Sequence, residues 1–159
     1  MDHIDFNLRV KRLSEDELTD EQRKAVVCAK AATRRSYSPY SHFRVGAAVV
    51  LDNGEVLTGA NQENSAYPSG LCAERTTVFY ANSRYPENGI KLICIAASDE
   101  LGNFTRRPIS PCGGCRQVLV ESEKRSGEPM QVLLYGTDCC YLIANARDLL
   151  PLAFDDTFL

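Results

Sequence analysis

The sequence predicts one α/β domain, a three-layer α/β/α sandwich around a mixed, mostly five-stranded sheet. Three observations support this class. The 159 residues suit one domain with a single core. Segments with helical spacing alternate with short apolar segments typical of strands. No repeat or low-complexity linker divides the chain, so we place one domain at residues 19–159 and treat residues 1–18 as an N-terminal extension of unknown role.

The first predicted elements are a helix and a hairpin. Thr19 and Gln22 fit a capping box, and small apolar residues recur behind them at helical spacing, which predicts a helix over residues 19–35. The continuous apolar run over residues 43–51 predicts a strand covered on both faces. An Asp-Asn-Gly turn signal follows this run, so residues 55–60 are expected to return as its hairpin partner.

The second half of the chain alternates in the same way. The predicted helices cover residues 71–84 and 112–124, the strands cover 92–98, 131–135 and 139–143, and one helical turn covers 146–150. Pro111 precedes the second of these helices, a position where proline is favoured. The stretch between the hairpin and the next helix is too polar for core and too short for a linker, so it is expected to be a loop.

Charge and cysteine content exclude several classes of protein. The net charge is −3 with Lys and Arg scattered, which argues against a basic face that grips a polynucleotide. No apolar run approaches the roughly 20 residues that cross a bilayer, and the first residues lack the apolar core of a secretory signal. A cytoplasmic location is therefore expected. Seven cysteines in a reducing compartment do not suggest a disulfide framework, so they need another explanation.

Three of these cysteines fall at predicted helix starts and suggest a metal site. Cys112 and Cys115 are three apart and share one helix face, and Cys72 starts the preceding helix. Three protein ligands with one open position is the pattern of a catalytic zinc. Glu74 lies two residues after Cys72, so we expect Cys72 to cap its helix while Glu74 reaches back beside the metal.

The charge on three thiolates would weaken zinc as a Lewis acid and has to be offset. Helix N-termini favour thiolates. Arg75 and Arg116 each follow a predicted ligand, and we expect them to donate to the sulfurs.

Other interpretations of the cysteines stay open at this point. The pair Cys112 and Cys115 alone also fits a redox motif or half of a structural zinc site. A closed site would need a fourth ligand, for which the sequence offers Cys94, Cys139, Cys140 or His42. Cys28 and Cys94 lie in apolar patterns and are most simply buried small hydrophobes, and Cys139 with Cys140 opens a strand and is taken as structural.

The motifs together resemble the small, homotetrameric, zinc-dependent class of cytidine deaminases. Cys-Ala-Glu at Cys72 and Pro-Cys-Gly-Gly-Cys before Arg116 are a form of the zinc-deaminase signature in which cysteine replaces the first histidine. The other matching segments are 38–48, 61–64, 112–117 and 149–154. The resemblance runs from about Ser36 to Phe154, and residues 1–18 remain outside it. The loop just before Cys72 is where this family varies.

This resemblance implies an activity and a set of residue roles. It implies hydrolysis of cytidine, and of deoxycytidine, to the uracil nucleoside and ammonia in pyrimidine salvage, with one Zn²⁺ per chain and Glu74 carrying protons. The implied substrate-binding residues are Phe43, Asn61, Glu63, Ala73, Tyr67 and Phe154. Tyr67 and Phe154 sit where the family lets one subunit complete a neighbour's pocket, so a homotetramer with shared active sites is implied.

Rival functions remain. A related zinc deaminase could act on another pyrimidine nucleoside, a nucleotide or a cytosine-bearing antibiotic. Asn61 and Glu63 favour an unphosphorylated ribose, because a carboxylate repels phosphate. A deaminase of polynucleotides would be expected to carry more basic surface. The rival from a different class is a non-catalytic zinc or redox module, for which Glu74 would have no use.

Overall fold

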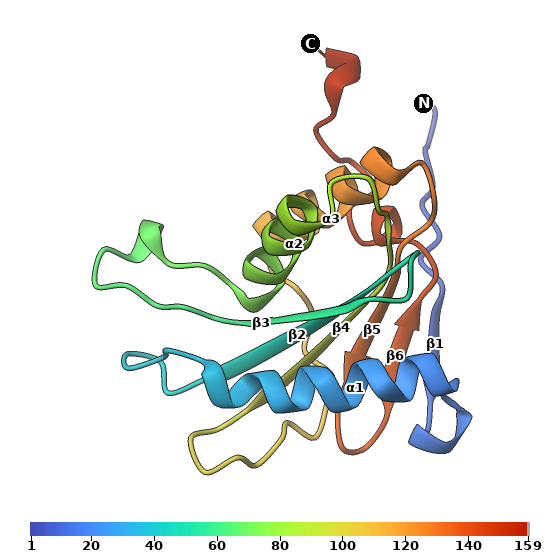
Figure 1. The fold of residues 1–159 in the computed structure, drawn as a ribbon. Coiled ribbons are helices and arrows are strands. Elements are labelled where there is room, and N and C mark those ends of the chain that lie inside the picture. Colours follow the sequence, from blue (N-terminus) through green and yellow to red (C-terminus); the bar gives the residue numbers. More distant parts are fainter. Residues whose placement is uncertain (159) are drawn as a thin grey trace.

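The computed structural model describes residues 1–158, which form one six-stranded sheet with helices on both faces (Figure 1). The helices are α1 (Asp20–Ala32), α2 (Ala73–Arg84) and α3 (Gly113–Ser126), and the strands are β1 (Val10–Leu13), β2 (Arg44–Leu51), β3 (Val56–Ala60), β4 (Ile90–Ser98), β5 (Gln131–Tyr135) and β6 (Cys140–Ile143). Helix α1 covers one face, and α2 and α3 cover the other. The three-layer α/β/α prediction is confirmed.

The prediction of five strands is wrong by one, because β1 lies within the segment treated as an extension. β1 pairs antiparallel with β6, with Val10 opposite Ile143 and Leu13 opposite Cys140. It has only four residues, of which three are exposed, so it carries no run of buried positions. Without such a run, strand periodicity does not separate these residues from the charged residues around them. The five predicted strands are all present with small shifts at their ends.

The sheet is mixed and has the order β1-β6-β5-β4-β2-β3. Only β4 and β5 pair in parallel among the described strands, because helix α3 lies between them in the chain. The inner strand β2, between β4 and β3, is buried on both faces, as its continuous apolarity predicted. Ala47, Val49 and Leu51 pack toward α2 and α3, whereas Ala48 and Val50 pack toward α1.

Helix α1 lies unusually close to β2 at Gly46. A Cβ atom at this position would lie 2.2 Å from the carbonyl oxygen of Ala29 and 2.7 Å from the backbone nitrogen of Thr33. Only glycine fits such a close approach of two backbones. The contact fixes the start of β2, and the loop that leads into this strand forms one wall of the cavity described below.

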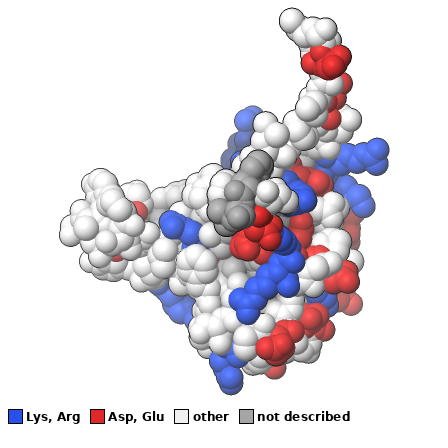
Figure 2. Space-filling model, turned by 90° about the horizontal axis from the view of Figure 1, so that it is seen from above, with Lys and Arg blue, Asp and Glu red and all other residues white. Residues whose placement is uncertain are grey.

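The surface carries charges of both signs. Figure 2 shows Lys and Arg interspersed with Asp and Glu over the face seen from above. In residues 1–158, no helix combines the length and the apolarity that crossing a bilayer requires.

Candidate functional site

Three cysteine sulfurs meet where the N-termini of α2 and α3 converge. Cys72 is the N-cap of α2 and Cys112 is the N-cap of α3, both with extended backbone, and Cys115 lies in the first turn of α3. Their Sγ atoms all lie within 4.8 Å of one another, and the Cys72 and Cys112 sulfurs are 3.9 Å apart. The extended cap turns Cys72 toward the sulfurs of α3, which an interior helical position would not do.

The donor set fits zinc with an open position. Thiolates at about 2.3 Å from a tetrahedral zinc lie about 3.8 Å from one another, close to the spacing seen here. Within the described part of the chain, no further His, Cys, Asp or Glu joins this group. The candidates for a fourth ligand, Cys94, Cys139, Cys140 and His42, therefore lie outside it. A closed structural site is not formed by the described residues, and three ligands is the count typical of a catalytic zinc.

The surroundings of the sulfurs favour a thiolate at Cys72. A hydrogen bond with Cys115, opposed by burial and then reinforced by the guanidinium of Arg75, lowers the pKa of Cys72 to about 5. The same hydrogen bond raises the pKa of Cys115, together with burial and the charge of Glu74. The partial positive charge of two helix N-termini adds to the preference for negative sulfur here.

Glu74 lies buried beside the sulfur cluster. Its side chain is 5% exposed, in the first turn of α2. Burial raises the pKa of Glu74, and the charge of Cys72 adds to the effect. A carboxyl group whose charged form is disfavoured can hold a proton and release it to a neighbour, as a general acid and base requires.

The two arginines next to the ligands behave differently. Arg75 lies beside Cys72, and its Nε is buried without a partner among the described residues. Arg116 was expected to donate to a sulfur, but its side chain donates to two backbone carbonyl oxygens instead. Its Nε donates to the carbonyl oxygen of Pro111 at 2.9 Å and its Nη1 donates to that of Leu149 at 3.1 Å. Arg116 therefore ties the start of α3 to the helical turn at Ala146–Leu149.

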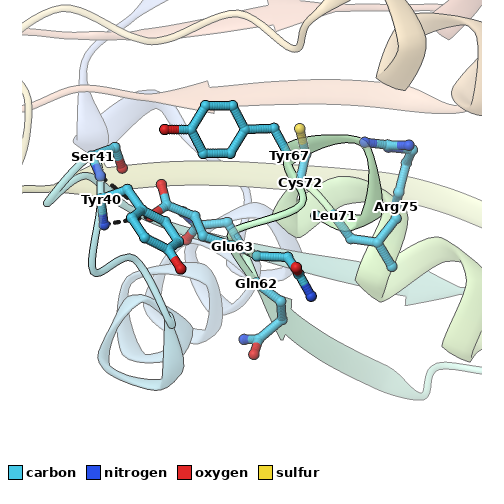
Figure 3. Close-up of a pocket in the computed structure, with 11 residues that line it drawn as sticks. Tyr40, Ser41, Gln62, Glu63, Tyr67, Leu71, Cys72 and Arg75 are labelled. Atoms are coloured by element: carbon cyan, nitrogen blue, oxygen red, sulfur yellow. Dashed lines mark hydrogen bonds between the residues drawn. The ribbon is translucent and has the colours of Figure 1, made fainter.

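A cavity of about 500 Å³ opens next to Cys72 and Arg75 (Figure 3). One wall is the loop before β2, and the other is the segment of residues 61–71, here called the arm, which projects from the sheet at the left of Figure 1. The cavity is lined by Tyr40, Ser41, Asn61, Gln62, Glu63, Asn64, Tyr67, Gly70, Leu71, Cys72 and Arg75. The rings of Tyr40 and Tyr67 meet edge to face across it, with centroids 6.0 Å apart. The volume suits a small ligand such as a nucleoside.

Asn61 and Glu63 hold the two walls of the cavity together. Glu63 Oε2 accepts the backbone N–H groups of Tyr40 at 2.9 Å and of Ser41 at 3.2 Å (Figure 3). Bonds from Ser41 and Tyr40 lower the pKa of Glu63, so its carboxylate is ionised at neutral pH.

Asn61, at the first position of the arm, fixes the start of β2. Its Oδ1 accepts the N–H of Val45 at 2.8 Å and a bond from Ser36, and its Nδ2 donates to the Phe43 carbonyl oxygen at 2.9 Å. Within the described part of the chain each residue keeps some bonding capacity, one Nδ2 hydrogen on Asn61 and lone pairs on the Glu63 carboxylate.

Of the four other predicted substrate residues, Tyr67 lines this cavity, and Ala73, Phe43 and Phe154 do not. Ala73 is fully buried at the start of α2. Phe43 is 38% exposed and Phe154 is 61% exposed, and neither belongs to the lining. Gln117 on α3 donates to the Phe154 carbonyl oxygen at 2.8 Å, which holds the C-terminal segment near α3. Tyr67 belongs to the lining yet remains 76% exposed, so its ring has room for contacts beyond this chain.

Sequence reasoning missed the backbone geometry of the loop before β2. The N–H groups of Tyr40 and Ser41 donate to Glu63. The resemblance covers both residues but implied no role for their backbone. His42 has φ 57°, and its Nδ1 lies 2.7 Å from Glu100 Oε1. No spacing or composition signal predicts a left-handed histidine, because the conformation follows from the path of the loop.

Comparisons with known proteins agree on one family. Residues 19–126 match the family model described as the cytidine and deoxycytidylate deaminase zinc-binding region. A cytidine deaminase of Halalkalibacterium halodurans is 44% identical over 90 residues, which are 57% of this chain and 63% of that protein. A probable cytidine deaminase of Dictyostelium discoideum is 39% identical over 104 residues, 64% of this chain and 65% of that protein. The chain thus spans less than two thirds of the length of these two relatives.

A solved structure matches over a longer range. The crystal structure of cytidine deaminase from Burkholderia pseudomallei superposes with a TM-score of 0.73 at 37% identity, covering 86% of this chain and 100% of that one. The crystal structure of cytidine deaminase from Mycobacterium tuberculosis gives a TM-score of 0.62 at 32% identity, covering 84% of this chain and 96% of that one.

Proposed function

Since the chain belongs to the family of zinc-binding cytidine and deoxycytidylate deaminases, we propose that it hydrolyses cytidine to uridine and ammonia. One observation carries this proposal: three sulfurs with an open position lie beside the buried Glu74, at the end of a cavity of nucleoside size. A structural zinc site would need a fourth ligand and would have no use for a buried carboxyl group. A redox pair would need no third cysteine.

Each group at the sulfur end has a defined task in this reaction. Cys72, Cys112 and Cys115 would hold Zn²⁺, which when bound would act as a Lewis acid that makes a water molecule nucleophilic near neutral pH. Glu74 takes the proton of the attacking water and delivers it to N3 of the pyrimidine, which makes C4 more electrophilic. Glu74, ionised again, then takes the second proton from the hydroxyl group added at C4 and delivers it to the departing amine, so that ammonia leaves as the C4 carbonyl forms. Its burial beside the sulfurs supports both roles, since the proton is held at a single site that excludes bulk water.

The cavity walls provide the nucleoside contacts. We assign the remaining lone pairs of the Glu63 carboxylate and the remaining Nδ2 hydrogen of Asn61 to the ribose 3′-hydroxyl. An ionised Glu63 favours an unphosphorylated sugar, because phosphate would be repelled. Neither contact uses the 2′-hydroxyl, so deoxycytidine is included among the proposed substrates. Phe43 is assigned to the pyrimidine ring, and the Ala73 backbone is assigned to the polar edge of the base.

The proposal extends to assembly, location and domain limits. The exposed rings of Tyr67 and Phe154 fit a homotetramer in which each subunit completes a neighbour's site. Seven free cysteines fit a reducing cytoplasm, where the enzyme would serve pyrimidine salvage. We keep residues 19–159 as the deaminase domain, with β1 as an addition to the edge of its sheet.

The test follows cytidine by its ultraviolet absorbance, with and without a strong zinc chelator. The expected result is conversion to uridine that the chelator abolishes. Glu74→Gln should keep one zinc per chain and lose turnover by about 10²–10⁴-fold, because it can no longer carry the proton. Glu87→Gln, an exposed loop position, is the matched control and should be unaffected. Zinc-loaded protein that leaves cytidine unchanged would refute the proposed substrate, and an active Glu74→Gln variant would refute the role of Glu74.

A further inference from the structure

The N-terminal segment carries an apolar stripe that the rest of residues 1–158 leaves exposed. Ile4, Phe6, Leu8 and Val10 alternate with polar residues, the period of an extended strand with one apolar face. All four are exposed, and Ile4 reaches 83%. Such a stripe is costly in water and marks a surface that another molecule covers. In Figure 1 the segment leaves the sheet at its β1 edge.

This stripe continues into an open sheet edge. The sheet ends at β1, which pairs with β6 on one side and with no described strand on the other. An open edge presents unpaired N–H and C=O groups that can accept a further strand. Residues ahead of Val10 extend the same strand direction, so an added strand could run along both β1 and the segment before it.

The charges of the segment suit a second copy of the same segment as the added strand. Acidic residues lie in its first part and basic residues in its second, with Asn7 between them. Two copies in antiparallel arrangement, with Asn7 opposite Asn7, place Asp5 opposite Arg9 of the second copy. No hydrogen bond or ion pair among the described residues engages Asp5 or Arg9 within one chain.

The same register matches the apolar residues. Phe6 falls opposite Leu8 and Ile4 falls opposite Val10, all on one face, since directly opposed residues of paired strands point the same way. We propose that residues 2–12 of two copies pair as antiparallel strands about a two-fold axis at Asn7, joining two sheets edge to edge.

This interface is separate from the assembly proposed above. The family model starts at residue 19, so the pairing segment lies outside it. It contains no residue of the sulfur cluster or the cavity. Its failure would therefore leave the proposed deaminase activity untouched, and the reverse also holds.

Disulfide trapping tests the register directly. Asn7→Cys places a thiol opposite its own copy, where opposed Cβ atoms lie about 4.5–5.5 Å apart, near the range of a disulfide. Mild oxidation should convert most chains of this variant to covalent dimers on a denaturing gel. Arg9→Cys is the matched control, because its two copies lie four residues apart along the strand, about 14 Å, and should not cross-link. Chains that stay monomeric in Asn7→Cys, or that cross-link equally in Arg9→Cys, would overturn the proposal.

Charge exchange provides a second test in the Asn7→Cys background. Asp5→Arg places an arginine opposite Arg9 of the other copy in both symmetric pairs, so the cross-linking rate should fall about tenfold. Adding Arg9→Asp reverses both charges of the pair and should restore the rate. Asp16→Arg, an exposed change of the same size outside the segment, should leave the rate unchanged. A double exchange that stays slow would contradict the register.

Discussion

The sulfur cluster and the cavity walls beside it are built in different ways. The sulfurs and Glu74 sit on the first turns of two helices that pack on the sheet, and Cys115 and Glu74 are buried. The walls are a loop and an arm held together by single side chains, and their rings are exposed. The proposed chemical groups thus lie together within one chain, whereas the walls leave apolar rings exposed. Changes in the first region should act on metal and turnover, and changes in the second on substrate binding and stability.

The largest effect is expected at the sulfur cluster. Cys115→Ala removes a buried ligand, so zinc should fall from one per chain to a small fraction, and turnover should fall at least about 10³-fold. Metal analysis and the cytidine assay measure both. Cys28→Ala, on α1, is the control, and this variant should still contain one zinc per chain. Full zinc occupancy in Cys115→Ala would show that Cys115 is not a ligand.

A smaller effect is expected at Glu63. Glu63→Gln keeps an oxygen for the N–H groups of Tyr40 and Ser41 but loses the charged acceptor for the ribose, so kcat/KM for cytidine should fall about 10–100-fold with zinc unchanged. The loss should almost vanish when both proteins are assayed with 3′-deoxycytidine. An equal loss of kcat/KM on both substrates would show that Glu63 does not bind the 3′-hydroxyl.

Asn61 should combine a binding role with a structural one. Asn61→Ala removes hydrogen bonds to Val45, Ser36 and Phe43, so the free energy of unfolding should fall by about 2–3 kcal/mol. The melting temperature should fall by at least about 4 °C, whereas Glu63→Gln should change it little. If Asn61→Ala and Glu63→Gln have the same melting temperature, the hydrogen bonds of Asn61 do not stabilise the arm.

The smallest effect is a pH dependence of the arm. Since the pKa of Glu63 is lowered in the folded state from 4.5, its ionised form stabilises the fold. This contribution is fully present above the unfolded value and is lost as the pH falls through the lower folded value. The difference in melting temperature between the native protein and Glu63→Gln should therefore stay constant from pH 8 to about 5 and shrink below it. A difference that shrinks between pH 8 and 6 would point to another titrating group.

The sequence predicted the buried region better than the exposed one. Cys72, Cys112 and Cys115 could be placed together because helix starts and a three-residue spacing determine where side chains point. The central strands could be placed because burial on both faces leaves a continuous apolar run. Both signals are local in the sequence.

What could not be predicted depends on contacts between distant segments. Arg116 was expected to donate to a sulfur but donates to Leu149, and this follows from where the helical turn Ala146–Leu149 lies. Asn61 reaches Val45 and Ser36 only because the arm and the loop run side by side. β1 left too few buried positions to be recognised. The contacts of Phe43, Tyr67 and Phe154 with substrate stay predictions.

The separation of the sulfurs along the chain has a consequence during synthesis. Cys72 and Cys112 are 40 residues apart. At about 5–20 residues per second, the ribosome needs about 2–8 s to add the residues between them. For that interval the growing chain holds Cys72 without its partners, as a lone thiol open to oxidants. The three ligands can therefore bind the metal only late in synthesis, after most strands of the sheet have been made. Metal binding then closes a loop of 40 residues.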